Sequence, residues 1–139
     1  MLPEFDADGN LPLGVYPATW GEIRERFGWN EQRARLLQGI ELVALELRAA
    51  GCRAVWLDGS FVTSKEEPAD FDLCYDLAST EVSRLDPSLR TLRDRTAMKE
   101  RYGGDILPTD PAMPFVKFFQ TDRDGRPKGI VQIDLESLK

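Results

Sequence analysis

Apolar residues recur every three or four positions between residues 31 and 50, which is the spacing of one face of an α-helix. Asn30 can cap the start of this helix, and Gly51 can end it. Because one stripe is apolar and the rest is polar, we expect the helix to lie on the surface with the stripe in the core. The stripe consists of Leu36, Leu37, Ile40, Val43, Ala44 and Leu47.

Two further helices are predicted from their start signals. Thr19 and Glu22 form a capping-box pattern, in which each residue can accept a hydrogen bond from the backbone of the other. A short helix over 20–27 should follow. Asp86 precedes a proline, a pair that favours the beginning of a helix, and the chain up to the next glycine predicts a helix over 87–102.

Two apolar runs, RAVWLD at 53–58 and DFDLCY at 70–75, predict strands separated by a polar loop. Side chains alternate between the two faces of a strand. Asp70, Asp72 and Cys74 should therefore share one face of the second strand, and its aromatic and aliphatic residues should share the other. Two carboxylates one residue apart in such an apolar strand call for a function.

The last third of the chain predicts two more strands, over about 114–120 and 128–135, joined by a turn that contains Asp-Gly. The order of elements is typical of an α+β fold, a mixed sheet of four or more strands with helices packed on it. A chain of 139 residues suits one domain. We therefore expect an extended arm over residues 1–18 and a single domain over 19–139.

Composition excludes several kinds of chemistry. The chain has no histidine, so Ser-His-Asp and Cys-His nucleophiles and histidine metal ligands are all excluded. Its net charge of -6 argues against a surface that wraps duplex DNA. Cys52 and Cys74 lack zinc-site spacing and are expected to be reduced, packed thiols. With no apolar run of membrane length and no signal-like N-terminus, we expect no membrane association and a cytoplasmic location.

A third carboxylate is expected to join the first two. Asp134 lies between two apolar residues of the last predicted strand and therefore points to its polar face. Asp70, Asp72 and Asp134 in one partly buried site would repel one another unless a cation neutralised them. Mg²⁺ prefers such oxygen ligands together with substrate phosphates. We expect two Mg²⁺ ions, with Mn²⁺ as the alternative ion, and an NTP as the substrate.

Gly59 and Ser60 end the first strand and are candidates for the phosphate contact. A glycine allows backbone amides to approach phosphate oxygens, and a serine hydroxyl adds a further donor. Lys65, in the following loop, is a weaker candidate for phosphate binding, since a loop lysine is more often simply solvated. Asp58, just before the glycine, is interpreted as a cap of the turn.

A Gly-Ser pair at a strand end, an Asp-x-Asp on the next strand and an Asp on a later strand together resemble the nucleotidyltransferase superfamily related to DNA polymerase beta. The resemblance covers roughly residues 53–136 and is closest to the minimal bacterial nucleotidyltransferases. The stretches PATW and LDGSFVTSK look like those of a group of small bacterial proteins in that superfamily. The resemblance implies a nucleotidyltransferase-like fold.

The resemblance also implies an enzyme that transfers a nucleoside monophosphate from an NTP to a hydroxyl group. Gly59 and Ser60 would then bind the triphosphate. Asp70 and Asp72 would bind Mg²⁺, with Asp134 as the third carboxylate. The expected acceptor is RNA or a partner protein, because little chain remains to build a small-molecule pocket. Several small members of such families belong to toxin–antitoxin or phage-defence pairs, which implies a cognate partner protein.

Two alternatives remain at the level of sequence. The chain could be a non-catalytic binding module, an antitoxin or regulatory subunit, that keeps the fold and holds a partner with its arm or with the basic helix 87–102. It could also be a nucleotide sensor that binds an NTP without turnover. The paired aspartates with Gly-Ser favour the enzyme.

Overall fold

The computed structural model describes residues 2–90, 95–110, 124–126 and 128–138. No helix in these residues combines the length and the apolar character needed to cross a bilayer. In chain order, the helices and strands within them are β1 (Val15–Ala18), α1 (Trp20–Phe27), α2 (Glu31–Ala49), β2 (Val55–Asp58), β3 (Phe71–Asp76), α3 (Thr96–Tyr102), β4 (Gly104–Thr109) and β5 (Ile130–Ile133).

The five strands form one mixed sheet in the order β1-β5-β2-β3-β4. The two outer pairs, β1 with β5 and β3 with β4, are parallel, whereas the central strand β2 is antiparallel to both of its neighbours, β5 and β3. A parallel pair needs a crossover connection, and α3 lies in the connection between β3 and β4. The mixed sheet and the helices packed on it confirm the predicted α+β class.

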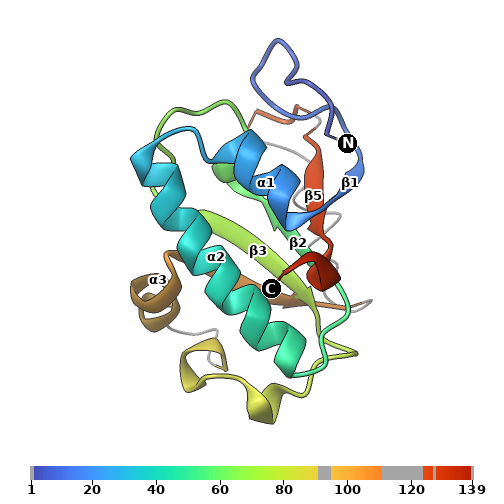
Figure 1. Cartoon of the computed structure of the whole chain (residues 1–139), viewed down its shortest axis with the longest axis vertical. Helices are drawn as coiled ribbons and strands as arrows, with labels where there is room; N and C mark the ends of the chain where they lie inside the picture. Colours follow the sequence, from blue (N-terminus) through green and yellow to red (C-terminus); the bar gives the residue numbers. More distant parts are fainter. Residues whose placement is uncertain (1, 91–94, 111–123, 127, 139) are drawn as a thin grey trace.

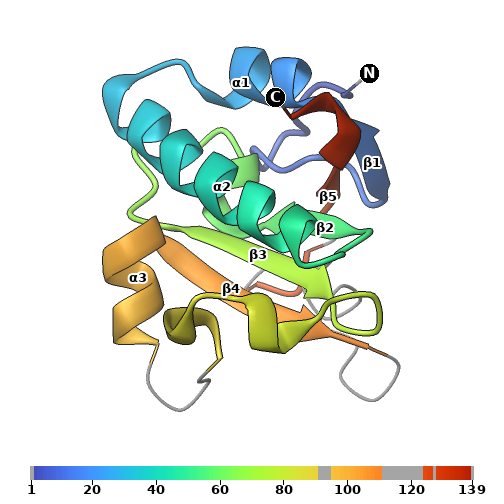
Figure 2. The ribbon, with the colours of Figure 1, turned by 60° about the horizontal axis from the view of Figure 1, so that its bottom comes forward.

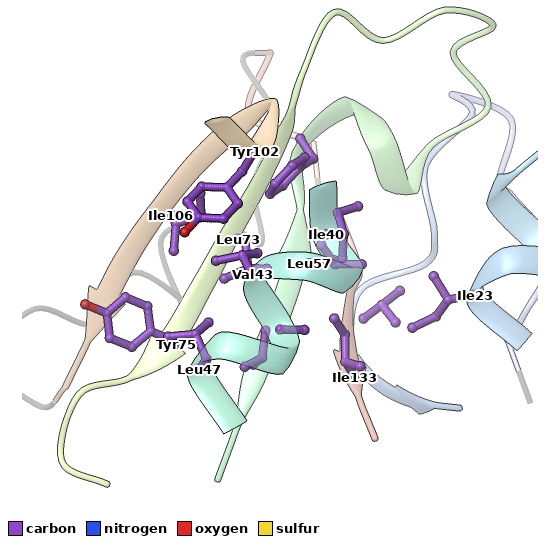
Figure 3. Close-up of a cluster of buried hydrophobic side chains, with 14 of the residues drawn as sticks. Ile23, Ile40, Val43, Leu47, Leu57, Leu73, Tyr75, Tyr102, Ile106 and Ile133 are labelled. Atoms are coloured by element: carbon purple, nitrogen blue, oxygen red, sulfur yellow. The ribbon is translucent and has the colours of Figure 1, made fainter. Parts of the chain in front are cut away.

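Helices α1 and α2 cover one face of the sheet (Figures 1 and 2). All six residues of the predicted stripe on α2 are buried, which confirms that prediction. Figure 3 shows how this stripe meets the aliphatic and aromatic side chains of β2, β3, β4 and β5. The core on this face includes Ile23, Ile40, Val43, Leu47, Leu57, Leu73, Tyr75, Tyr102, Ile106 and Ile133.

The predicted starts of α1 and α2 are observed. Thr19 Oγ1 accepts a hydrogen bond from the amide of Glu22 at 3.2 Å, and Glu22 Oε1 accepts one from the amide of Thr19 at 3.1 Å. This is a complete capping box. Asn30 caps α2 in the same way, since its Oδ1 accepts from the amide of Arg33 at 2.9 Å. Local signals alone therefore fix where these helices begin.

Other predicted boundaries were wrong. Residues Pro87–Leu89 form a 3-10 turn, and α3 begins only at Thr96. Strand β5 ends at Ile133, two residues before the predicted end. The predicted strand over 114–120 lies outside the described residues.

Strands β1 and β4 were not predicted at all. Each contains a proline, Pro17 in β1 and Pro108 in β4, and proline counts against a strand in sequence patterns. Both are the outermost strands of the sheet as described, where a missing amide hydrogen is tolerated. Residues 15–18, expected to belong to the extended arm, are therefore part of the sheet.

Helices α2 and α3 approach each other so closely at Gly39 that a Cβ atom there would overlap the carbonyl group of Tyr102. We predict that Gly39→Ala lowers the free energy of unfolding by about 1–3 kcal/mol, because the two helices must move apart. Urea denaturation followed by circular dichroism measures this change.

The matched control is Gly21→Ala in α1, where the nearest atom to the new Cβ would be 3.9 Å away. Alanine favours a helix more than glycine does, so this variant should be as stable as the wild type or more stable by up to about 1 kcal/mol. Equal losses in both variants would contradict the close approach at Gly39.

Candidate functional site

Gly59 turns the chain out of β2 directly against the side chain of Asp72. Its φ is +74°, a conformation that other residues rarely adopt. A Cβ atom at this position would also overlap the carboxylate of Asp72. The residue must therefore be glycine for two independent reasons. The Gly-Ser turn predicted to bind phosphate and the carboxylate predicted to bind metal are in contact.

Arg33, on α2, holds the loop that follows this turn. Its side chain is fully buried and its guanidinium lies 3.7 Å from the centre of the Trp29 ring. Burial lowers its pKa to about 10, so it remains a cation at neutral pH. It donates hydrogen bonds of 2.6–3.1 Å to the carbonyl oxygens of Phe27, Phe61, Thr63 and Lys65. This interaction, which holds residues 61–65 against the start of α2, was not predicted from the sequence.

Three carboxylates gather at the start of β3 and β4. Asp72 of β3 is aligned with Asp105 of β4 in the parallel register, so both side chains point to the same face, away from α2. Asp70 precedes β3 and points the same way. Burial, and then the charges of Asp70 and Asp105, raise the pKa of Asp72 to about 6. Sequence analysis identified Asp70 and Asp72 but missed Asp105, because β4 was not predicted.

Asp58 adds a fourth carboxyl group, opposite Asp72 in the antiparallel pair β2–β3. It is 1% exposed, and burial together with the charge of Asp72 raises its pKa to about 8. Its Oδ2 accepts a hydrogen bond from the thiol of Cys74 at 3.8 Å. Within the described part of the chain, no group hydrogen-bonds to its Oδ1. The side chain makes no capping hydrogen bond, so its interpretation as a turn cap was wrong.

Basic side chains offset this negative charge. Lys99 Nζ lies 3.7 Å from Asp70 Oδ2 and 3.6 Å from Asp105 Oδ2, and Arg95 Nη1 lies 3.7 Å from the same Asp105 oxygen. Lys99 lies on α3 and Arg95 directly precedes it, and α3 lies beside β3 and β4 at one end of the sheet (Figure 2). Lys128, just before β5, is 9% exposed, and its charge acts against the increase in the pKa of Asp58 and Asp72.

Asp134 does not join this cluster. Gln132 of β5 is aligned with Trp56 of β2, and the two strands are antiparallel. Position 130, not 134, is therefore aligned with Asp58, and four residues of strand separate Asp134 from that point, on the order of 13 Å.

The placement of Asp134 in a metal site with Asp70 and Asp72 is thus not supported by the structure. Its Oδ1 instead accepts a hydrogen bond from the amide of Glu136 at 3.1 Å, which caps the 3-10 turn Leu135–Ser137. It lines a cavity of about 530 Å³ at the other end of the sheet, together with Arg48 and Gln132.

The two remaining candidates lie in or after the turn. Ser60 is half-buried, and its carbonyl oxygen accepts hydrogen bonds from the amide and hydroxyl of Thr63 at 3.2 and 2.6 Å. Lys65 has an exposed side chain, while its backbone is held by Arg33 and by a 3.2 Å hydrogen bond from its amide to Thr63 Oγ1. Contact of either side chain with phosphate stays a prediction.

The donor set fits a divalent cation that is bound together with phosphate. In the described residues, no three acidic, cysteine or histidine side chains lie close enough to form a complete metal site. Mg²⁺ needs only one or two protein carboxylates when substrate phosphates supply further oxygens. Asp105 Oδ1, like Asp58 Oδ1, is buried and receives no hydrogen bond within the described residues. Asp72, flanked by Asp70 and Asp105, would hold the cation.

The raised pKa values predict that the metal-free protein loses stability as the pH rises. Asp58 and Asp72 have pKa values of about 8 and about 6 in the folded state, above that of an unfolded aspartate. The folded state then binds more protons than the unfolded state between pH 5 and 8. The free energy of unfolding should fall by about 1–3 kcal/mol over this range.

Urea denaturation at several pH values and constant ionic strength measures this loss. Asp72→Asn should reduce the slope, since an amide does not titrate. Stability that is constant or increases from pH 5 to 8 would contradict the buried carboxyl cluster.

Comparison with protein families shows a match over residues 3–134 to a family described as a family of unknown function (DUF6932). The comparisons with curated proteins and with solved structures give no match. The matched segment spans nearly the whole chain and includes β1 to β5 and the carboxylate cluster. The protein therefore belongs to the DUF6932 family.

Proposed function

We propose that the protein is a Mg²⁺-dependent nucleotidyltransferase, which transfers a nucleoside monophosphate from an NTP to a hydroxyl group of RNA or of a partner protein. The observation that carries the proposal is the contact between Gly59 and the Asp72 carboxylate. It joins a turn suited to phosphate to a carboxylate suited to metal. The resemblance in sequence to nucleotidyltransferases rests on this turn and on Asp70 and Asp72, and also on Asp134, which lies outside the proposed site.

Gly59 and Ser60 would bind the triphosphate through backbone amides and the serine hydroxyl. Asp70, Asp72 and Asp105 would hold one or two divalent cations, so Asp105 replaces Asp134 in the proposed site. The bound cations would polarise the α-phosphoryl group and stabilise the pyrophosphate that leaves. In the reaction, the acceptor oxygen bonds to the α-phosphorus while the bond from that phosphorus to pyrophosphate breaks, and the hydroxyl proton of the acceptor passes to water.

The fully buried Arg33 supports this role of the turn. A phosphate site made of backbone amides works only when the backbone is held in place before the ligand arrives. Arg33 holds this backbone in place by donating hydrogen bonds to carbonyl oxygens on both sides of residue 62. The carbonyl groups then point toward Arg33.

One observation favours a second function, a non-catalytic binding module such as the antitoxin or regulatory half of a two-gene pair. Lys99 and Arg95 already neutralise part of the carboxylate cluster, as fixed cations would in a protein that no longer binds metal. The described residues also hold no complete set of three metal ligands. A nucleotide sensor would differ from both, because it would bind an NTP and release no pyrophosphate.

We predict that Asp72→Asn and Asp105→Asn each lower nucleotidyl transfer by about 100-fold or more, because each removes charge at the proposed metal site. The assay incubates the protein with each α-³²P-labelled NTP, Mg²⁺ or Mn²⁺, and either total RNA or lysate. Label on an RNA or protein band identifies the class of acceptor.

Asp134→Asn is the matched control. Asparagine caps a turn about as well as aspartate, so this variant should keep its fold and its activity within about threefold. Loss of activity in Asp134→Asn with activity retained in Asp105→Asn would contradict the proposed site. No label with folded wild-type protein, under any condition, would favour the binding module.

A further inference from the structure

Lys99 occupies the position in the cluster where a cation is needed. Its ammonium group lies near two carboxylates, one just before β3 and one on β4, 3.7 Å from Asp70 Oδ2 and 3.6 Å from Asp105 Oδ2. Its charge also acts on Asp72, whose pKa it lowers against the effect of burial. A divalent cation bound at these carboxylates would have to take them from Lys99.

We propose that Lys99 competes with the divalent cation for Asp70 and Asp105 in the free protein, and binds the triphosphate once the cation has displaced it. This inference rests on the proposed function and assigns a residue to its substrate. The two roles belong to two states of the site, so one substitution should change metal affinity and nucleotide affinity in opposite directions.

The competition follows from charge and exposure. The Lys99 side chain is 48% exposed, so its ion pairs are formed largely in water and are individually weak. A divalent ion carries twice the charge and can be held by both carboxylates at shorter distances. Lys99 would therefore weaken binding of the cation without preventing it.

The second role follows from position. Once the carboxylates bind a cation, the ammonium group loses both partners and its flexible four-carbon chain is free to turn. The turn at Gly59 contacts Asp72, which is aligned with Asp105 and lies two residues after Asp70, so a triphosphate at this turn would bring new negative charge to the same end of the sheet. A triphosphate bound there would be within the field of Lys99. Lysine is a common phosphate ligand in such sites.

The fold does not depend on Lys99. Helix α3 is anchored by Met98 and Tyr102, whose side chains are buried, whereas the Lys99 side chain is half-exposed. Arg101 provides the matched control, since it lies on the same helix and is 46% exposed. Its ion pairs are with Glu46 and Asp86, which are not part of the carboxylate cluster. Replacing it removes one positive charge from α3 and leaves the cluster intact.

The test measures two affinities in wild type, Lys99→Met and Arg101→Met by calorimetry. Mn²⁺ alone comes first, followed by α,β-methylene-ATP at saturating Mn²⁺. Lys99→Met should bind Mn²⁺ about threefold to tenfold more tightly and the nucleotide analogue about tenfold more weakly. Arg101→Met should change both by less than about twofold, and Lys99→Arg should restore most of the nucleotide affinity.

Weaker or unchanged Mn²⁺ binding by Lys99→Met would overturn the competition, and unchanged binding of the analogue would overturn the phosphate role. Equal effects of Arg101→Met would show a general effect of charge and would also overturn the inference. Wild-type protein that binds Mn²⁺ but not the analogue would contradict the proposed function and the phosphate role together. The Mn²⁺ measurement with Lys99→Met would then still decide the competition by itself.

Discussion

Gly59 and the Asp72 carboxylate lie so close together that no side chain fits between them. This contact exists because β2 and β3 are aligned so that Asp58 faces Asp72 and the next residue turns away with positive φ. Arg33 then holds the departing loop through three of its carbonyl groups, those of Phe61, Thr63 and Lys65, on the side of the sheet that α2 covers. The turn and the carboxylates are thus positioned by the core, before any ligand binds.

This arrangement is electrostatically unfavourable. Four carboxyl groups lie at one end of β2, β3 and β4, and burial with mutual repulsion keeps protons on Asp58 and Asp72 at higher pH than usual. The chain offsets part of the charge with Arg95 and Lys99, at the start of and within α3, and with Lys128, just before β5. Such a cluster is unfavourable for folding alone, which is the pattern expected where a cation or substrate completes a site.

Local signals predicted the parts of the fold that depend on neighbouring residues: the caps of α1 and α2, the stripe of α2 and the face of β3 that carries Asp72. They failed where the position of a residue depends on the pairing of strands that are distant in sequence. Alternation placed Asp134 on a face but could not say at which end of the sheet it lies, because that depends on the direction in which β5 pairs with β2. Asp105 was missed because Pro108, which counts against a strand in a sequence pattern, prevented the prediction of β4.

The most direct test of the account is anomalous diffraction from crystals grown with Mn²⁺ and α,β-methylene-ATP. The account predicts a Mn²⁺ peak on the carboxylate of Asp72, shared with Asp70 or Asp105, and a triphosphate against the turn at Gly59. A peak at Asp134, or a nucleotide bound away from Gly59, would contradict it.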